Sequence, residues 1–154
     1  MDEKNFTTQE VEKIMNDVKN LPYPINMAMS CAWILGNLKG VNLNMFNLQE
    51  KSSLCDYTVV AYATNHRQAQ AMSLEIERQM KKRGQKVYSI EGSRDADWTL
   101  VDLGDVIIHI LLETARESYL LEELWSDCQK VQIPSEYYFS NENEDLESTS
   151  KEYF

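Results

Sequence analysis

The sequence contains little cysteine: Cys31, Cys55 and Cys128 are the only three in 154 residues. They are odd in number, widely spaced and without a C-x-x-C pair, which argues against both a disulfide framework and a zinc site. The first ten residues hold three acids and no apolar block, unlike a secretory signal or a transit peptide. We therefore expect a protein of the reducing cytoplasm.

The sequence also lacks a long apolar run. Its longest candidates, such as Val106 to Leu112, are interrupted by His109. None approaches the ~20 residues that are needed to cross a bilayer. We therefore expect no membrane-spanning segment and no membrane partner.

Positive charge is scarce as well. Fifteen Lys and Arg residues stand against 25 Asp and Glu residues, which gives a net charge of −10. This balance works against a large phosphate-neutralising face, so we expect little direct nucleic-acid binding. The acids concentrate between residues 91 and 127, where ten of them stand against Arg94 and Arg116. The distribution favours a basic partner.

The composition that is present, with 43% apolar and 26% charged residues, is typical of a soluble globular protein. At this length we expect one core. Caps, apolar spacing and stop residues predict helices over 8–19, 24–39, from Thr64 or Asn65 to Arg83, and from Glu113 or Thr114 to about Trp125. Alternation and β-branched residues predict strands over 41–48, 56–63, 86–91, 98–103 and 106–112.

These elements predict an α/β fold: one domain with a mixed, about five-stranded sheet and flanking helices. Strand, helix and strand from Asp56 to Glu91 make one βαβ unit with parallel strands. The last two strands are joined by Leu103-Gly104-Asp105, which predicts a tight hairpin in which Gly104 takes positive φ.

The chain is predicted to have three parts: an N-terminal helical extension (1–22), the α/β domain (23–134) and an acidic tail (135–154). Pro22 and Pro24 end the first helix. The last fifteen residues hold five acids and one lysine with few apolar groups. Such a composition is typical of disorder.

Several motifs stand in a characteristic order between about Ile25 and Trp125. They are Asp56-Tyr57 opening a strand, Arg67, Glu91-Gly92, Trp98, the run Asp102-Leu103-Gly104-Asp105, His109, and Arg116 with Tyr119, Glu123, Leu124 and Trp125. In these motifs the sequence resembles the ribosomal silencing factor family, also called RsfS or Iojap. It departs from that family at Asn65-His66-Arg67-Gln68, where typical members have a serine-rich S-S-R-H segment, so no role is carried over to that segment.

The resemblance implies a domain related in fold to nucleotidyltransferases but without their catalytic signature. It implies binding to the large ribosomal subunit through its fourteenth protein, at the face that meets the small subunit. Occupying that face blocks subunit joining and represses translation by steric exclusion, while organelle members are linked to large-subunit assembly. The choice between silencing and assembly stays open, as does the formation of a homodimer.

The predicted hairpin is the best candidate for the partner-binding site, because aromatic and apolar groups rimmed by acids suit a basic protein surface. The predicted partner-binding residues are Asp97, Trp98, Asp102, Leu103, Asp105 and Tyr119. For Trp98 the alternative is a place in the core. For Tyr119, which stands near Arg116, Glu123 and Trp125 in the sequence, the alternative is an internal packing cluster that borders the interface.

Other chemistry is weighed against this interpretation. His109 has no second histidine or cysteine nearby in the sequence, so we expect a hydrogen-bonded core histidine and no metal. Gly92-Ser93 with Asp95 and Asp97 superficially resembles the signature of nucleotidyl transfer, in which two carboxylates hold Mg²⁺. The turn, helix and acidic strand of such a site cannot fit between Ser93 and Asp95, so we expect no enzyme and no cofactor. An acidic module for a nonribosomal basic protein is the third alternative.

Overall fold

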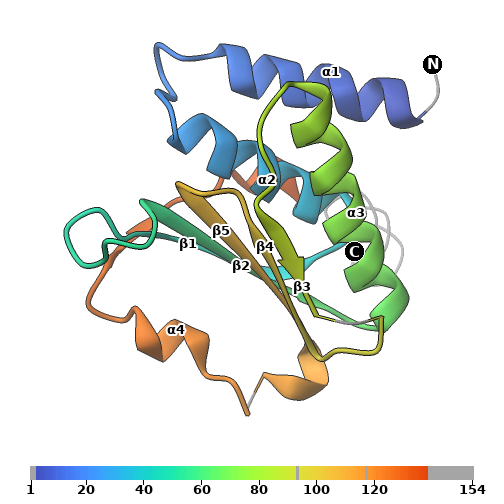
Figure 1. The fold of residues 1–154 in the computed structure, drawn as a ribbon, viewed down its shortest axis with the longest axis vertical. Helices are drawn as coiled ribbons and strands as arrows, with labels where there is room; N and C mark the ends of the chain where they lie inside the picture. Colours follow the sequence, from blue (N-terminus) through green and yellow to red (C-terminus); the bar gives the residue numbers. More distant parts are fainter. Residues whose placement is uncertain (1–2, 93, 117, 139–154) are drawn as a thin grey trace, which may run out of the picture.

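A six-stranded mixed sheet runs through the protein, as seen in a computed structural model that describes residues 3–92, 94–116 and 118–138 (Figure 1). Its strands are β1 (Val41–Asn47), β2 (Tyr57–Ala63), β3 (Ser89–Glu91), β4 (Trp98–Asp102), β5 (Val106–Leu112) and β6 (Gln129–Val131). Their order across the sheet is β3-β4-β5-β2-β1-β6. The central pair β2 and β5 is parallel, and every other neighbouring pair is antiparallel.

The strand predictions are largely confirmed, with three differences, the first of which is that β3 begins at Ser89 rather than at Lys86. The hairpin forms as predicted, with β4 and β5 antiparallel and Gly104 at a φ of 89°. In the predicted βαβ unit, β2 and β3 do run in the same direction, but β5 and β4 lie between them. The sheet has six strands rather than about five, because β6 pairs with β1. A strand of three residues is too short to show an alternating pattern.

Three helices lie on one side of the sheet: α1 (Glu3–Asn16), α2 (Ile25–Asn37) and α3 (His66–Lys82), of which α2 and α3 pack on the sheet itself. The predicted ends of α3 are confirmed, since the Asn65 side chain accepts a hydrogen bond from the Gln68 amide and Gly84 takes a φ of 79°. Helix α1 begins at Glu3 rather than near Thr8. Thr8 lies inside the helix, where its hydroxyl accepts a hydrogen bond from the Gln79 side chain at 3.2 Å.

The N-terminal extension packs on the α/β core. Val11 of α1 is fully buried and belongs to the main apolar cluster. Phe6 stacks at a tilt on Trp33 of α2, with ring centroids 5.9 Å apart. Helix α1 therefore adds a second layer over α2 on the side away from the sheet (Figure 1).

The opposite face of the sheet is covered by a mostly irregular segment, and the prediction of a helix from Glu113 or Thr114 to Trp125 is wrong. The structure has a 3₁₀ turn η1 (Glu113–Ala115) and the short helix α4 (Leu121–Leu124). Leu121 is buried against the sheet and Trp125 packs beside it. Tertiary contacts with the sheet thus override the helix propensity of this charged, leucine-rich stretch.

Ordered structure continues beyond the predicted domain boundary at residue 135. Ser135–Tyr137 form the 3₁₀ turn η2, and Tyr137 is buried. A Cβ atom at Gly36 of α2 would collide with the Tyr137 carbonyl oxygen, so glycine lets the two backbones approach. The predicted disorder of residues 139–154 lies outside the residues that the structure describes.

Candidate partner-binding surface

Strand alternation gives the face of the sheet away from α2 and α3 its own set of side chains. Neighbouring residues of a strand point to opposite faces, and cross-strand partners share a face. Trp98 of β4 is paired with Leu111 of β5, and both belong to the apolar cluster on this side. We call this side the aromatic face. Its aromatic members are Phe46, Tyr62, Trp98, His109, Tyr119 and Trp125.

Trp98 is held by two neighbours on the aromatic face. Its indole Nε1–H donates a hydrogen bond to His109 Nδ1 at 3.1 Å. Its ring also packs against Tyr119, with centroids 5.0 Å apart and planes tilted by 57°. Trp98 remains partly exposed, and 38% of Tyr119 is exposed. The pair thus forms an aromatic edge that is accessible to a partner and supported from below.

His109 is the polar centre of the aromatic face, and its prediction as a hydrogen-bonded core histidine is confirmed. Only 7% of the residue is exposed, and burial lowers the pKa of its imidazole to about 4. The ring is therefore neutral at physiological pH, which leaves Nδ1 free to accept the indole proton. On the other side of His109 lies Trp125, at 5.4 Å between centroids, and Trp125 in turn packs on Phe46.

The covering segment is attached to the sheet by a polar contact. The Tyr62 hydroxyl donates to Glu122 Oε1 at 2.6 Å. Arg116 lies 3.6 Å from the same carboxylate and over the Tyr62 ring at 5.1 Å. Burial, and then the hydrogen bond to Glu122, raise the pKa of Tyr62 above its usual range. The phenol therefore stays protonated as the donor.

Two exposed leucines follow Tyr119 in the sequence. Leu120 and Leu124 are 49% and 66% exposed. Leu120 precedes α4, and Leu124 is the last residue of α4. Acidic groups accompany them: Glu122 and Glu123 are on the same helix. An apolar patch with acids at its border is the arrangement expected for docking a basic protein surface.

Asp97 precedes Trp98 and borders the same end of β4. Its Oδ1 lies 3.5 Å from His66 Nε2, a charge contact that depends on protonation of the histidine. Its backbone carbonyl accepts a hydrogen bond from the Leu112 amide. The structure thus brings together Trp98 and Tyr119, whereas the Asp97 carboxylate lies on the α3 side of the sheet, away from the aromatic face.

The structure separates the other predicted residues from this edge. Asp102 ends β4, about 13 Å from Trp98 for four strand residues, and Asp105 lies in the turn beyond it. Asp102 Oδ1 accepts from the Gly104 amide at 2.8 Å, and Asp105 accepts from the Tyr23 hydroxyl at 2.9 Å. Leu103 is only 1% exposed and lies in the main core. The prediction of Leu103 as a surface contact is therefore wrong.

The aromatic face includes residues that the sequence analysis did not select. Phe46 and Tyr62 come from β1 and β2, and no short-range pattern links them to Trp98. The exposed Leu120 and Leu124 carry one recognisable signal, the four-residue apolar spacing that is typical of a helix, but Leu120 precedes α4 and is not helical.

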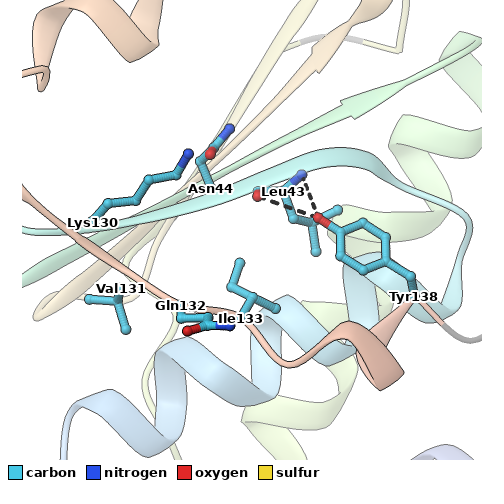
Figure 2. Close-up of a pocket in the computed structure, with 7 residues that line it drawn as sticks. All are labelled: Leu43, Asn44, Lys130, Val131, Gln132, Ile133 and Tyr138. Atoms are coloured by element: carbon cyan, nitrogen blue, oxygen red, sulfur yellow. Dashed lines mark hydrogen bonds between the residues drawn. The ribbon is translucent and has the colours of Figure 1, made fainter.

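A groove between β1, β6 and the segment that follows β6 offers a different kind of site (Figure 2). It has a volume of about 290 Å³ and is lined by Leu43, Asn44, Lys130, Val131, Gln132, Ile133 and Tyr138. Tyr138 reaches across it and its hydroxyl contacts both the amide and the carbonyl of Leu43, at 3.1 and 3.4 Å. The groove thus has amide and aliphatic walls with one lysine at its border.

The features behind the enzyme alternative lie near a second, smaller pocket of about 140 Å³ between α3 and the loop after β3. Gly92 and Arg94 line it together with His66. Asp95 is exposed, and Asp97 contacts His66. Within the described ranges, no group of three His, Cys, Asp or Glu residues could hold a metal ion. No described helix is long and apolar enough to cross a membrane.

Comparison with known proteins gives consistent matches. The family model described as ribosomal silencing factor during starvation matches residues 22–153. The ribosomal silencing factor RsfS of Haemophilus influenzae is 40% identical over 92 residues, covering 60% of this chain and 90% of that protein. The mouse mitochondrial assembly of ribosomal large subunit protein 1 is 36% identical over 88 residues, covering 53% of this chain and 39% of that protein.

Solved structures match the fold as well. A crystal structure of a protein from Bacillus halodurans has a TM-score of 0.60 and 26% identity, covering 69% of this chain and 97% of that one. A crystal structure of a protein from Chromobacterium violaceum has a TM-score of 0.59 and 26% identity, covering 83% of this chain and 90% of that one. The implied relationship to nucleotidyltransferases stays a prediction.

Proposed function

The chain belongs to the ribosomal silencing factor family, and we propose that it silences ribosomes by binding the fourteenth protein of the large subunit. While bound there, it occupies the face that meets the small subunit and prevents subunit joining. The observation that carries this proposal is the exposed Trp98–Tyr119 edge, with its ring contact at 5.0 Å.

The chemistry of this edge supports a basic protein as the partner. Large aromatic side chains that are exposed and held in place contribute much of the affinity at protein interfaces. The exposed Glu123 stands four residues after Tyr119, Asp97 precedes Trp98 on the α3 side, and the chain has a net charge of −10. These charges attract a basic surface during encounter, while the aromatic and leucine side chains provide the contact area.

The proposed contact residues follow from their placement. Trp98 and Tyr119 form the centre, Asp97 borders it on the α3 side, and Leu120 and Leu124 extend it along the covering segment. Asp102 and Asp105, at the far end of β4, act as steering charges. Leu103 supports the turn from the core.

The mechanism needs no chemical step. A partner-bound domain and the small subunit compete for one area, so silencing depends on occupancy alone. We propose accordingly that the protein is not an enzyme and needs no cofactor or metal. The alternative function, an acidic module that binds a nonribosomal basic protein, is tested by identifying the partner that the protein captures.

Sucrose-gradient sedimentation of cell lysate tests the proposal. We expect the protein with free large subunits and little of it on joined ribosomes. Equal amounts on joined ribosomes would contradict steric exclusion. Capture of an unrelated basic protein without ribosomal material would favour the acidic module, and metal-dependent nucleotide turnover abolished by Asp95→Asn would favour the enzyme.

A matched pair of leucine variants locates the surface. Leu124 on α4 and Leu74 on α3 are 66% and 52% exposed, and they lie on elements that cover opposite faces of the sheet (Figure 1). We expect Leu124→Ser to weaken binding to isolated large subunits and Leu74→Ser to leave it unchanged. Equal effects, or the reverse order, would place the interface away from the aromatic face.

A further inference from the structure

His109 stands in an otherwise apolar strand, in the run Val106-Ile-Ile-His-Ile-Leu-Leu112. A buried polar side chain costs stability unless it is hydrogen-bonded. Its partner in the structure is the indole N–H of Trp98, at 3.1 Å. The polar residue and the donor that satisfies it therefore meet at the candidate interface.

The geometry of the pair makes His109 a rigid support. In the β4–β5 register, Trp98 is opposite Leu111 and Leu100 is opposite His109, so Trp98 and His109 are diagonal neighbours. Aromatic side chains reach each other across such a diagonal. Strand β5 pairs with β2 on one side and β4 on the other, and Trp125 packs against the imidazole. The acceptor therefore has little freedom to move.

An indole that is partly exposed on a strand needs such support in order to bind well. Fixing a free aromatic side chain at an interface costs ordering entropy at the moment of binding. An indole N–H that enters a contact also loses its water partner, and it needs a replacement acceptor. His109 Nδ1 meets both needs before any partner arrives.

We infer that His109 is a positioning residue for partner binding: it holds the Trp98 indole in its docking orientation and satisfies the indole N–H internally. This inference rests on the proposed function. It also defines the partner chemistry, because the partner surface that receives Trp98 then needs no acceptor for the indole N–H. Apolar or cationic groups that contact the ring faces suffice there.

Two substitutions separate positioning from packing. His109→Leu keeps a side chain that suits an apolar strand but removes the acceptor. His109→Asn keeps an acceptor oxygen close to the position of Nδ1. Affinity for isolated large ribosomal subunits is measured for the wild type and both variants, together with thermal unfolding.

We expect His109→Leu to bind at least tenfold more weakly, about 1.4 kcal/mol, and His109→Asn to stay within about threefold of the wild type. Hydrogen exchange of the Trp98 indole N–H, assigned by its loss in Trp98→Phe, should be slow in the wild type and His109→Asn and fast in His109→Leu. A role in packing alone would not produce this difference in exchange.

The outcomes distinguish this inference from the proposed function. If the wild type does not bind large subunits, the proposed function fails. If the wild type binds and a folded His109→Leu variant binds equally well, the positioning role fails. Should His109→Leu not fold, His109→Asn decides: normal binding with a protected indole N–H supports the inference, and normal binding with an unprotected one overturns it.

Discussion

The Tyr62 hydroxyl and the Glu122 carboxylate, 60 residues apart in the chain, form a hydrogen bond of 2.6 Å. Tyr62 is fully buried in a central strand, whereas Glu122 belongs to the segment that covers the aromatic face. This bond fixes the covering segment at the level of the sheet where Tyr119 meets Trp98. The shape of the candidate interface therefore depends on a contact outside it.

Removal of this hydroxyl should loosen the covering segment. Tyr62→Phe leaves the ring in place and deprives Glu122 of its donor, which we expect to cost about 1–2 kcal/mol of unfolding free energy. Hydrogen exchange in residues 118–125 should accelerate more than exchange in α3. Tyr23→Phe is the matched control, since Tyr23 also donates to a carboxylate, that of Asp105, but at an exposed site. Equal exchange in both variants would contradict the role of Tyr62.

Truncation of Trp98 should affect binding more than folding. If the indole is the centre of the interface, Trp98→Ala weakens binding to the ribosomal partner by roughly 2 kcal/mol, about thirtyfold. The variant loses ring contacts with Tyr119 and His109, so a modest decrease in unfolding temperature is expected. Calorimetry and thermal unfolding decide the assignment. A stable variant with normal affinity would move the interface toward the Tyr119 and Trp125 side, and a severely destabilised variant would make Trp98 a core residue.

The charges at the two ends of β4 should differ in effect. Asp97→Lys places a cation at the residue that precedes Trp98 and removes the carboxylate that faces His66, so we expect a slower association and a faster dissociation. Asp105→Lys, at the distant turn, should slow association and reduce its salt dependence while leaving dissociation nearly unchanged, because peripheral charges mainly steer encounter. Stopped-flow measurements at two salt concentrations separate the two rates. A larger effect of Asp105→Lys on dissociation would indicate that the turn makes direct contact.

Folding stability should depend on the ionisation of His109. Burial lowers its pKa from 6.5 to about 4, so between these pH values the unfolded chain binds a proton that the folded protein does not. Acid therefore favours unfolding through this group, and its contribution to stability is lost as pH falls from about 6.5 toward 4, by up to about 3 kcal/mol. Denaturant titrations should show a shallower decline in His109→Asn than in the wild type. Parallel curves would contradict the assignment.

Leu103→Ala tests the correction made by the structure. Leu103 is buried in the main core, so we expect a loss of about 2–5 kcal/mol in unfolding free energy. The folded fraction should bind large subunits with normal affinity. A stable variant with weakened binding would restore Leu103 to the interface.

The elements with local signals were predictable from the sequence. Asn65 and Gly84 mark the two ends of α3, and Gly104 marks the turn of the β4–β5 hairpin. The irregular segment after β5 was not predictable, because Leu121 and Glu122 follow contacts with distant residues such as Tyr62 rather than helical preference. The same holds for β6, which exists only by pairing with β1.

The candidate site was predictable only where its residues are close in the sequence. Trp98 is partly exposed and stays a predicted contact, but Leu103 was grouped with it by proximity in sequence. The two residues are five positions apart, and in a strand an odd difference in position places two side chains on opposite faces. That rule, applied to the predicted strand 98–103, would have separated them. The neighbours Phe46 and Tyr62 required knowledge of the strand order.

The outermost strands of the sheet are its shortest: β3 and β6 have three residues each, whereas β2 and β5 at the centre have seven. A long exposed edge strand offers backbone groups to any passing chain and promotes aggregation. Here the apolar, valine- and isoleucine-rich strands β2 and β5 lie between other strands. In the described sheet, β2 and β5 are paired on both sides, so only three-residue strands are left at its two edges.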